Sequence, residues 1–255
     1  MDGFKSTQDF KTLREFESFY QILKPAQVNN SETFIWFSEI PHPLFNAVMH
    51  YSSSLHQNKK IETLIQEMQK TIPITFWMHP QNKMEKNFTD FLIQSGFQSI
   101  ITCPLMSLSV KSQLHLPFDI RPAQMDIFND LLANNFQFDK NVKESFGKLL
   151  ESSSMYNYLI YIHGMPIGTG TLVPNKKIGG IFNISVLPEF QKKGYGKAIT
   201  QFLIQKAYDL EIQKLILLSS PQAEKIYSDL GFKKVFDVQI YAQIKQELEQ
   251  STTSI

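Results

Sequence analysis

Residues 183–198 of the chain read NISVLPEFQKKGYGKA. The apolar run before Pro188 is typical of a strand, and proline ends regular pairing because it lacks the N–H that a ladder needs. Gly194 and Gly196 then precede a helical pattern that continues to Leu210. Glycine lets the backbone approach a ligand closely, and the first N–H groups of a helix have no internal partner, so they attract an anion. These residues predict a strand–turn–helix unit suited to a phosphate or pyrophosphate.

Two other phosphate-binding motifs compete with this interpretation, and both fail. A dinucleotide fingerprint needs a third glycine where Ile199 stands. A P-loop that ends at Lys197 needs glycine in place of Gln191 and a hydroxyl in place of Ala198. A plain helix entry without a ligand stays open as the structural alternative.

The periodicity of residues 118–241 predicts a mixed α/β fold in the order β-α-α-β-β-β-α-β-α-β. Alternating apolar residues and turn residues define the expected strands at 118–122, 156–163, 167–173, 180–187, 215–218 and 232–241. Helical spacing defines the expected helices at 123–136, 142–150, 194–210 and 223–230.

A second pattern divides the chain. Gly96-Phe97 and Gly231-Phe232 each follow a helical stretch and precede an apolar run, and each helix follows a β-rich run. A strand–helix–Gly-Phe–strand unit that occurs twice indicates two related halves. We therefore expect an N-terminal domain at 1–112 and a C-terminal domain at 113–255.

The motif around Gln191 resembles the acetyl-CoA-binding signature of the GNAT superfamily, in which an apolar strand leads to Val-x-Pro and then to Gln/Arg-x-x-Gly-x-Gly/Ala. The segment AEKIYSDLGF at 223–232 resembles the second conserved block of that superfamily. The resemblance implies an α/β fold with mixed central sheets and two GNAT-like halves in tandem. Residues 49–60 contain no glycine, so the N-terminal half resembles a degenerate copy that has lost cofactor binding.

The resemblance implies roles for particular residues. Backbone groups of Ile184, Ser185 and Val186 would pair with the pantetheine arm of acetyl-CoA, and the Val186 N–H would donate to the thioester oxygen as it becomes an oxyanion. Ser220 stands where many members have an asparagine that contacts the CoA arm. The pyrophosphate would be held by the turn and the helix start, namely Gln191, Lys192, Lys193, Gly194, Tyr195, Gly196, Lys197 and Ala198.

Tyr227 is the expected general acid. Attack of an amine on a thioester releases a thiolate with a pKa near ~8.5, and a phenol with a pKa near ~10 can protonate it. A tyrosine that only packs in the core is the alternative. The base that takes the amine proton stays open between Glu189, His163 and a water held by Asn183, because residues 214–218 contain no carboxylate.

Composition narrows the class of protein. The chain has 255 residues, a formal net charge of +1 and one cysteine, Cys103, so it fits neither a disulfide framework nor a strongly basic nucleic-acid-binding protein. No spacing of metal ligands, signal peptide or membrane span is recognised, so we expect a cytoplasmic monomer or homodimer without a metal. The expected function is N-acetylation of a small-molecule or peptide amine with acetyl-CoA. A silent CoA-binding regulatory module and a plain interaction protein are the alternatives.

Overall fold

The structure is a computed structural model that describes residues 7–24, 26–29, 33–51, 63, 66–67, 70, 72–78, 90, 92–112, 117–151 and 154–243. Two compact units divide the chain. Unit 1 contains residues 1–5, 26–103 and 237–255, and unit 2 contains residues 6–25 and 104–236. The strands β5 (Phe97–Ser109) and β11 (Lys233–Gln243) each run from one unit into the other. The expected boundary at residue 112 and the relation between the two halves stay predictions.

Unit 1 is a sheet in the order β1-β2-β3-β4-β11. Its elements are β1 (Val28–Asn29), β2 (Thr33–Phe37), the short 3-10 helix η1 (Pro43–Phe45), β3 (Asn46–Tyr51), β4 (Thr75–Met78) and residues 237–243 of β11. Phe76 and Phe97 meet edge to face at 4.9 Å in its core, where Ile35, Val48 and Tyr241 are also buried. The aromatic and β-branched side chains of these short strands therefore supply one apolar core.

A buried asparagine organises the turn between β2 and β3. The Asn46 side chain is fully buried, and its Nδ2 donates to the carbonyls of Ile40 (2.7 Å) and Pro73 (3.2 Å). Its Oδ1 accepts the Ser38 N–H at 3.1 Å. The side-chain amide thus satisfies backbone groups that the turn leaves without a strand partner.

Unit 2 contains the sheet β5-β10-β9-β8-β7-β6, in which β9 and β10 are parallel and the other neighbours are antiparallel. The strands are residues 104–109 of β5, β6 (Asp119–Pro122), β7 (Tyr156–Ile162), β8 (Met165–Asn175), β9 (Ile178–Val186) and β10 (Lys214–Leu218). The helices are α1 (Thr7–Leu23), α4 (Met125–Phe136), α5 (Lys140–Glu151), α6 (Tyr195–Asp209) and α7 (Glu224–Asp229). Every strand and helix that the sequence predicts between residues 118 and 241 is confirmed, within a few residues at each end.

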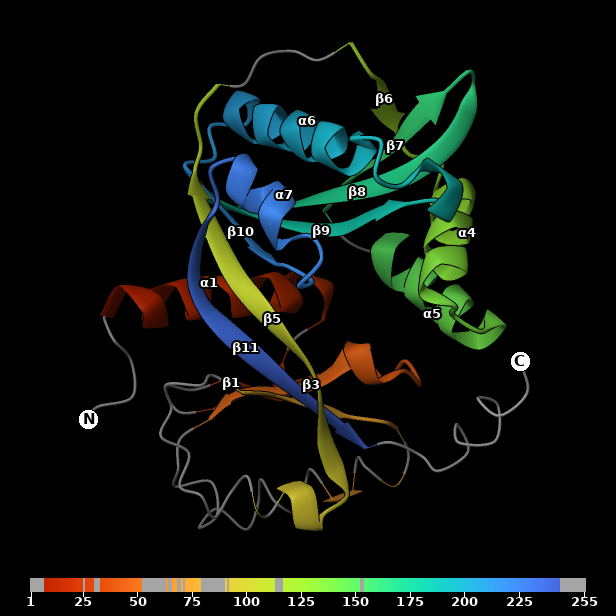
Figure 1. Cartoon of the computed structure of the whole chain (residues 1–255). Coiled ribbons are helices and arrows are strands. Elements are labelled where there is room, and N and C mark those ends of the chain that lie inside the picture. The colour runs from red at the N-terminus through yellow and green to blue at the C-terminus, as the bar shows by residue number, and fades with distance from the viewer. Residues whose placement is uncertain are drawn as a thin grey trace. The chain divides into compact units, whose positions relative to one another are not determined.

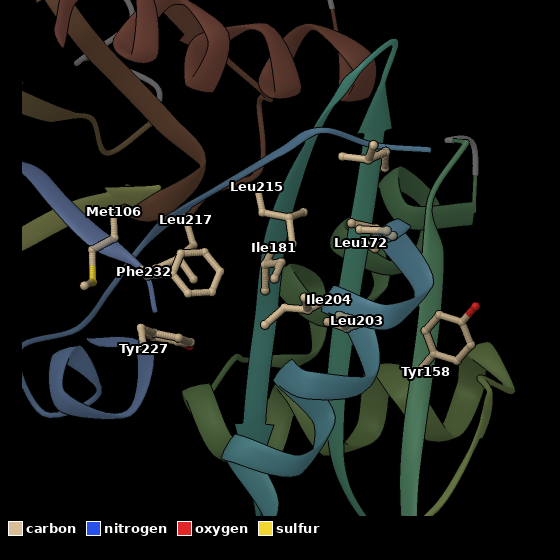
Figure 2. Packing of buried hydrophobic residues seen from close by; sticks show 12 residues of the cluster. Met106, Tyr158, Leu172, Ile181, Leu203, Ile204, Leu215, Leu217, Tyr227 and Phe232 are labelled. Carbon is tan, nitrogen blue, oxygen red and sulfur yellow. The ribbon is translucent and has the colours of Figure 1, made fainter. Parts of the chain in front are cut away.

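Helix α6 covers one face of the unit 2 sheet (Figure 1). Its Leu203 and Ile204 side chains pack with Leu172 and Ile181 of the strands, as Figure 2 shows. Helix α4 lies on the opposite face. Ile184 packs toward α6, whereas the next residue, Ser185, bonds to Asn135 of α4. Successive side chains of a strand point to opposite faces of the sheet. The sheet is therefore buried on both faces, which explains the nearly continuous apolar sequence of β10.

Helix α1 belongs to unit 2 although it begins the described chain. Phe182 of β9 stacks on Phe16 (6.0 Å) and meets Phe19 edge to face (5.9 Å). The Lys214 Nζ donates to Glu15 at 2.7 Å. Because Phe182 and Ile181 point to opposite faces of the sheet, α1 lies on the same face as α4.

One carboxyl group of α1 is buried without full hydrogen bonding. The Glu17 side chain is 1% exposed, its Oε2 accepts from Arg14 at 2.6 Å, and its Oε1 has no partner. Burial raises the pKa of Glu17 to about 8, and the nearby Arg14 only partly opposes this shift. The group is therefore largely a neutral acid at pH 7.

The repeated pattern is present at both predicted places. Gly96 (φ 81) and Gly231 (φ 93) both have the left-handed conformation that ends a helix. The phenylalanine that follows each glycine is buried, and a long strand continues from it as β5 or β11. The Gly-Phe signal thus marks a local helix–strand junction in each case.

Candidate active site

Strands β9 and β10 pair over a short distance and then separate. Their parallel pairing joins Ile178, Gly179 and Gly180 to residues 214–216. Strand β9 continues to Val186 beside β8, while β10 continues to Leu218 beside β5. Among the described residues, 181–186 therefore have a strand neighbour on the β8 side only.

The backbone of Ile184 and Val186 faces this open edge. The Leu187 N–H donates to the Ile167 carbonyl of β8 at 2.9 Å. Successive N–H groups of a strand point to opposite edges, so the Val186 and Ile184 N–H groups point away from β8. An extended ligand can add here as a further strand. Ser185 differs from its two neighbours, because its buried hydroxyl accepts from Asn135 of α4 at 2.5 Å.

The segment after β9 turns back on the strand end. The 3-10 helix η3 (Pro188–Phe190) leads to Gln191, whose Nε2 donates to the Val186 carbonyl at 3.0 Å. The Lys193 Nζ donates to the Glu189 carbonyl at 2.9 Å and lies 5.4 Å from the Phe190 ring centre. Two side chains that sequence reasoning assigns to the phosphate thus also brace the turn itself.

The turn enters α6 in a conformation that needs glycine. Gly194 has φ 90, and nothing lies within 4 Å of the position of a Cβ there. The first intrahelical bond from this end joins the Ala198 N–H to the Gly194 carbonyl at 2.9 Å. Within the part of the chain that the structure describes, the N–H groups of residues 192–197 donate to no protein atom. Six consecutive amides at a helix start make an anion site, whereas the Ala198 N–H is already used.

Tyr227 lies in α7 within the apolar cluster that covers the α6 face. Its ring meets Phe232 edge to face at 5.9 Å, and Figure 2 shows the two side by side. Ile184 of the open edge packs against the same cluster. Burial raises the pKa of Tyr227 to about 12, so the phenol stays protonated at every physiological pH.

Ser220 follows β10 and begins the turn into α7. Its carbonyl accepts the Ala223 N–H at 3.1 Å and the Ser219 hydroxyl at 2.7 Å. Its side chain is exposed. Ser220 thus lies just beyond the end of β10, the strand that separates from β9 at the split.

The three candidates for the base lie in different settings. His163 is exposed in the β7–β8 turn, and Glu189 is exposed in η3. Asn183 sits in β9 with a left-handed φ of 55, and its Nδ2 donates to the Thr171 hydroxyl at 3.0 Å. Sequence reasoning missed Thr169, Thr171 and Asn135, whose polar side chains surround this part of β9.

Two polar side chains of the N-terminal half have hydrogen-bond partners within unit 1. His42 Nδ1 accepts the Leu44 N–H at 3.3 Å and begins η1, and Trp77 Nε1 donates to Thr75 at 2.8 Å. His56 and His79 lie outside the described residues. In the described ranges, no three His, Cys, Asp or Glu side chains come together as metal ligands do. No described helix has the length and apolar character that crossing a membrane requires.

Comparison with known proteins agrees with this geometry. A family model described as "Acetyltransferase (GNAT) domain" matches residues 125–245. No curated protein matches the sequence. A GCN5-related N-acetyltransferase from Kribbella flavida has a similar structure (TM-score 0.67, 12% identity), with 93% of this chain and 98% of that chain covered.

Two further structures share the fold. A GCN5-related N-acetyltransferase from Sphaerobacter thermophilus has a TM-score of 0.62 at 11% identity, over 82% of this chain and 75% of that one. A functionally unknown conserved protein from Staphylococcus epidermidis has a TM-score of 0.63 at 14% identity, with 86% of this chain and 94% of that chain covered. At these identities the likeness shows the fold alone. Together with the family match, it identifies residues 125–245 as a GNAT acetyltransferase domain.

Proposed function

We propose that the chain transfers an acetyl or other short acyl group from acetyl-CoA to an amine. The observation that carries the proposal is the continuity of two features: the open edge at Ile184 and Val186, and the six free amides of residues 192–197. An extended pantetheine arm needs the first feature, and a pyrophosphate needs the second. Lys192 and Lys197 are exposed beside the amides and add positive charge.

The amine nitrogen attacks the thioester carbon and forms a C–N bond. The carbonyl oxygen becomes negative, and the Val186 N–H on the open edge donates to it. The C–S bond then breaks with its electron pair on sulfur, and the Tyr227 hydroxyl acts as general acid by donating a hydrogen bond to that sulfur as its charge develops. The attacking nitrogen, which became positively charged when the C–N bond formed, loses a proton to solvent or to a base that water connects to the site, and the product is a neutral amide.

Acetyl-CoA should stabilise the protein against unfolding. At a hundred times its dissociation constant, a ligand of the folded state adds about 2.7 kcal/mol to the free energy of unfolding. We expect Gly194→Ala to weaken binding about tenfold, because a side chain at φ 90 is strained and displaces the amides. The same acetyl-CoA concentration then adds only about 1.4 kcal/mol. Thermal shift measured over a range of acetyl-CoA concentrations tests both values.

Gly164→Ala is the matched control. Gly164 also has a positive φ (79) with nothing near its Cβ position, but it lies in the β7–β8 turn. We expect this variant to lose stability and to keep the full response to acetyl-CoA. If acetyl-CoA does not change the thermal stability of the wild-type protein, the proposal is contradicted and a plain interaction protein is favoured.

Thiol release in the presence of a panel of amines separates the enzyme from a silent CoA-binding module. The expected result is thiol release that depends on both the amine and acetyl-CoA. A clear thermal shift without thiol release for any amine would favour the regulatory module.

A further inference from the structure

Strand β9 contains an extra residue within the open edge, just before Ile184. Phe182 pairs with Thr171 of β8, and Ser185 pairs with Thr169, so β9 uses three steps where β8 uses two. Asn183 takes up the difference with φ 55, a conformation that asparagine tolerates better than other side chains. This is a β-bulge.

The bulge decides which N–H groups face the open edge. Phe182 and Ser185 both pair with odd-numbered residues of β8, whose backbone groups point at β9. An even-numbered residue of β9 therefore faces β8 before the bulge, and an odd-numbered one faces it afterwards. Without the extra residue, the Val186 N–H would point into β8 and could not reach a ligand on the open edge.

Three side chains hold the bulge. The Thr169 hydroxyl donates to the Asn183 carbonyl at 2.7 Å, and the Asn183 Nδ2 donates to the Thr171 hydroxyl at 3.0 Å. The Thr171 hydroxyl in turn donates to Asn157 Oδ1 at 2.7 Å. Both threonines are fully buried, so water cannot replace these bonds. We call Thr169, Thr171 and Asn183 the bulge clamp.

We infer that the bulge clamp is a positioning device for the reaction, which keeps the Val186 N–H aimed at the thioester oxygen. The inference rests on the proposed function and adds to it, because none of the three side chains needs to touch the substrate. An oxyanion donor acts only when its direction is fixed before the reaction. Side-chain bonds to a strained backbone residue supply that fixation.

The test compares Thr171→Val with Thr171→Ser in the full-length chain. Valine keeps the shape of threonine but removes the hydroxyl, whereas serine keeps it. We expect Thr171→Val to lower kcat for thiol release about tenfold, since a misdirected donor loses part of its effect, with a smaller change in the affinity for CoA. CoA keeps the pantetheine arm that pairs with the open edge but lacks the thioester carbonyl, so its affinity does not depend on the bond from the Val186 N–H to that oxygen. Thr171→Ser should restore most of the turnover.

Amide hydrogen exchange gives a readout that does not depend on activity. The backbone amides of Ser185 and Leu187, which face β8, should exchange faster in Thr171→Val than in the wild type or in Thr171→Ser. Asn183→Gly provides a second variant, because glycine adopts φ 55 readily but lacks the side-chain amide. It should fold and show the same losses as Thr171→Val.

The outcomes separate the inference from the function on which it rests. A wild-type protein that releases no thiol with any amine contradicts the proposed function. In that case amide hydrogen exchange is the measurement that tests whether the bulge clamp holds the backbone. Unchanged exchange at Ser185 and Leu187 in Thr171→Val and Asn183→Gly overturns the inference about the bulge clamp. So does wild-type turnover in both variants. A purely structural role would lower the thermal stability of these variants without changing kcat per folded molecule.

Discussion

Tyr227→Phe lowers turnover ten- to a hundred-fold and leaves the affinity for acetyl-CoA nearly unchanged. The variant keeps the ring that packs on Phe232 and loses only the hydroxyl. A hundred-fold loss corresponds to about 2.7 kcal/mol, which is the size expected for one hydrogen bond to a developing negative charge. Thiol release at saturating amine, together with a thermal shift by acetyl-CoA, measures the two quantities.

Tyr158→Phe is a suitable control, because Tyr158 is buried in the same apolar cluster and its ring contacts Phe202 at 4.8 Å. This variant should keep its turnover. Equal turnover in Tyr227→Phe and the wild type would remove Tyr227 from the mechanism.

The raised pKa of Tyr227 also predicts the shape of the pH profile. The hydroxyl must be protonated to donate, and its pKa of about 12 places the loss of that proton far above the ordinary value. Turnover should therefore show no alkaline decrease from Tyr227 below about pH 11. Since a thiol has a pKa near ~8.5, full transfer of the phenol proton to sulfur would cost about 5 kcal/mol. Hydrogen bonding to the departing sulfur is thus the main contribution.

Glu17→Gln stabilises the protein at pH 8 and has little effect at pH 4. The folded protein holds Glu17 at a pKa of about 8 because of burial, against 4.5 as the ordinary value. The neutral acid is therefore favoured by folding. The stability that this gives is complete below pH 4.5 and is lost as the pH rises toward 8. Glutamine has nearly the same shape and stays neutral, so the variant avoids the loss, which is on the order of 4 kcal/mol.

Chemical unfolding at several pH values between 4 and 8 measures this difference. Glu15→Gln removes a carboxylate from the same helix, the one that pairs with Lys214 at 2.7 Å. That control keeps Glu17 and should keep the wild-type fall in stability with pH. A free energy of unfolding that falls with pH equally in Glu17→Gln and the wild type would show that Glu17 ionises freely in the fold.

The turn at Gln191 could be predicted from sequence because its physics is local. Pro188, the glycine pair and the helix start act on neighbouring backbone groups, and the structure shows the free amides that they imply. The bulge at Asn183 could not be predicted in the same way. Its left-handed backbone depends on hydroxyls from β8, which lies twelve or more residues away.

Two further features depend on distant contacts. An isolated tyrosine gives no sign of its burial, so the sequence predicts an ordinary pKa near ~10 for Tyr227 where the structure gives about 12. Helix α1 bonds to residues as far as 202 positions away, at Lys214. Amphipathic spacing alone does not indicate which sheet such a helix will cover.

The position of α1 has a consequence for synthesis of the protein. The ribosome makes this helix before the strands of Phe182 and Lys214, which it packs on and which emerge more than 150 residues later. At about 5–20 residues per second, Phe16 and Phe19 wait on the order of ten seconds or longer for their partners. During that interval their aromatic rings are a target for chaperones and for aggregation, and unit 2 completes its folding only after residue 236 has been translated.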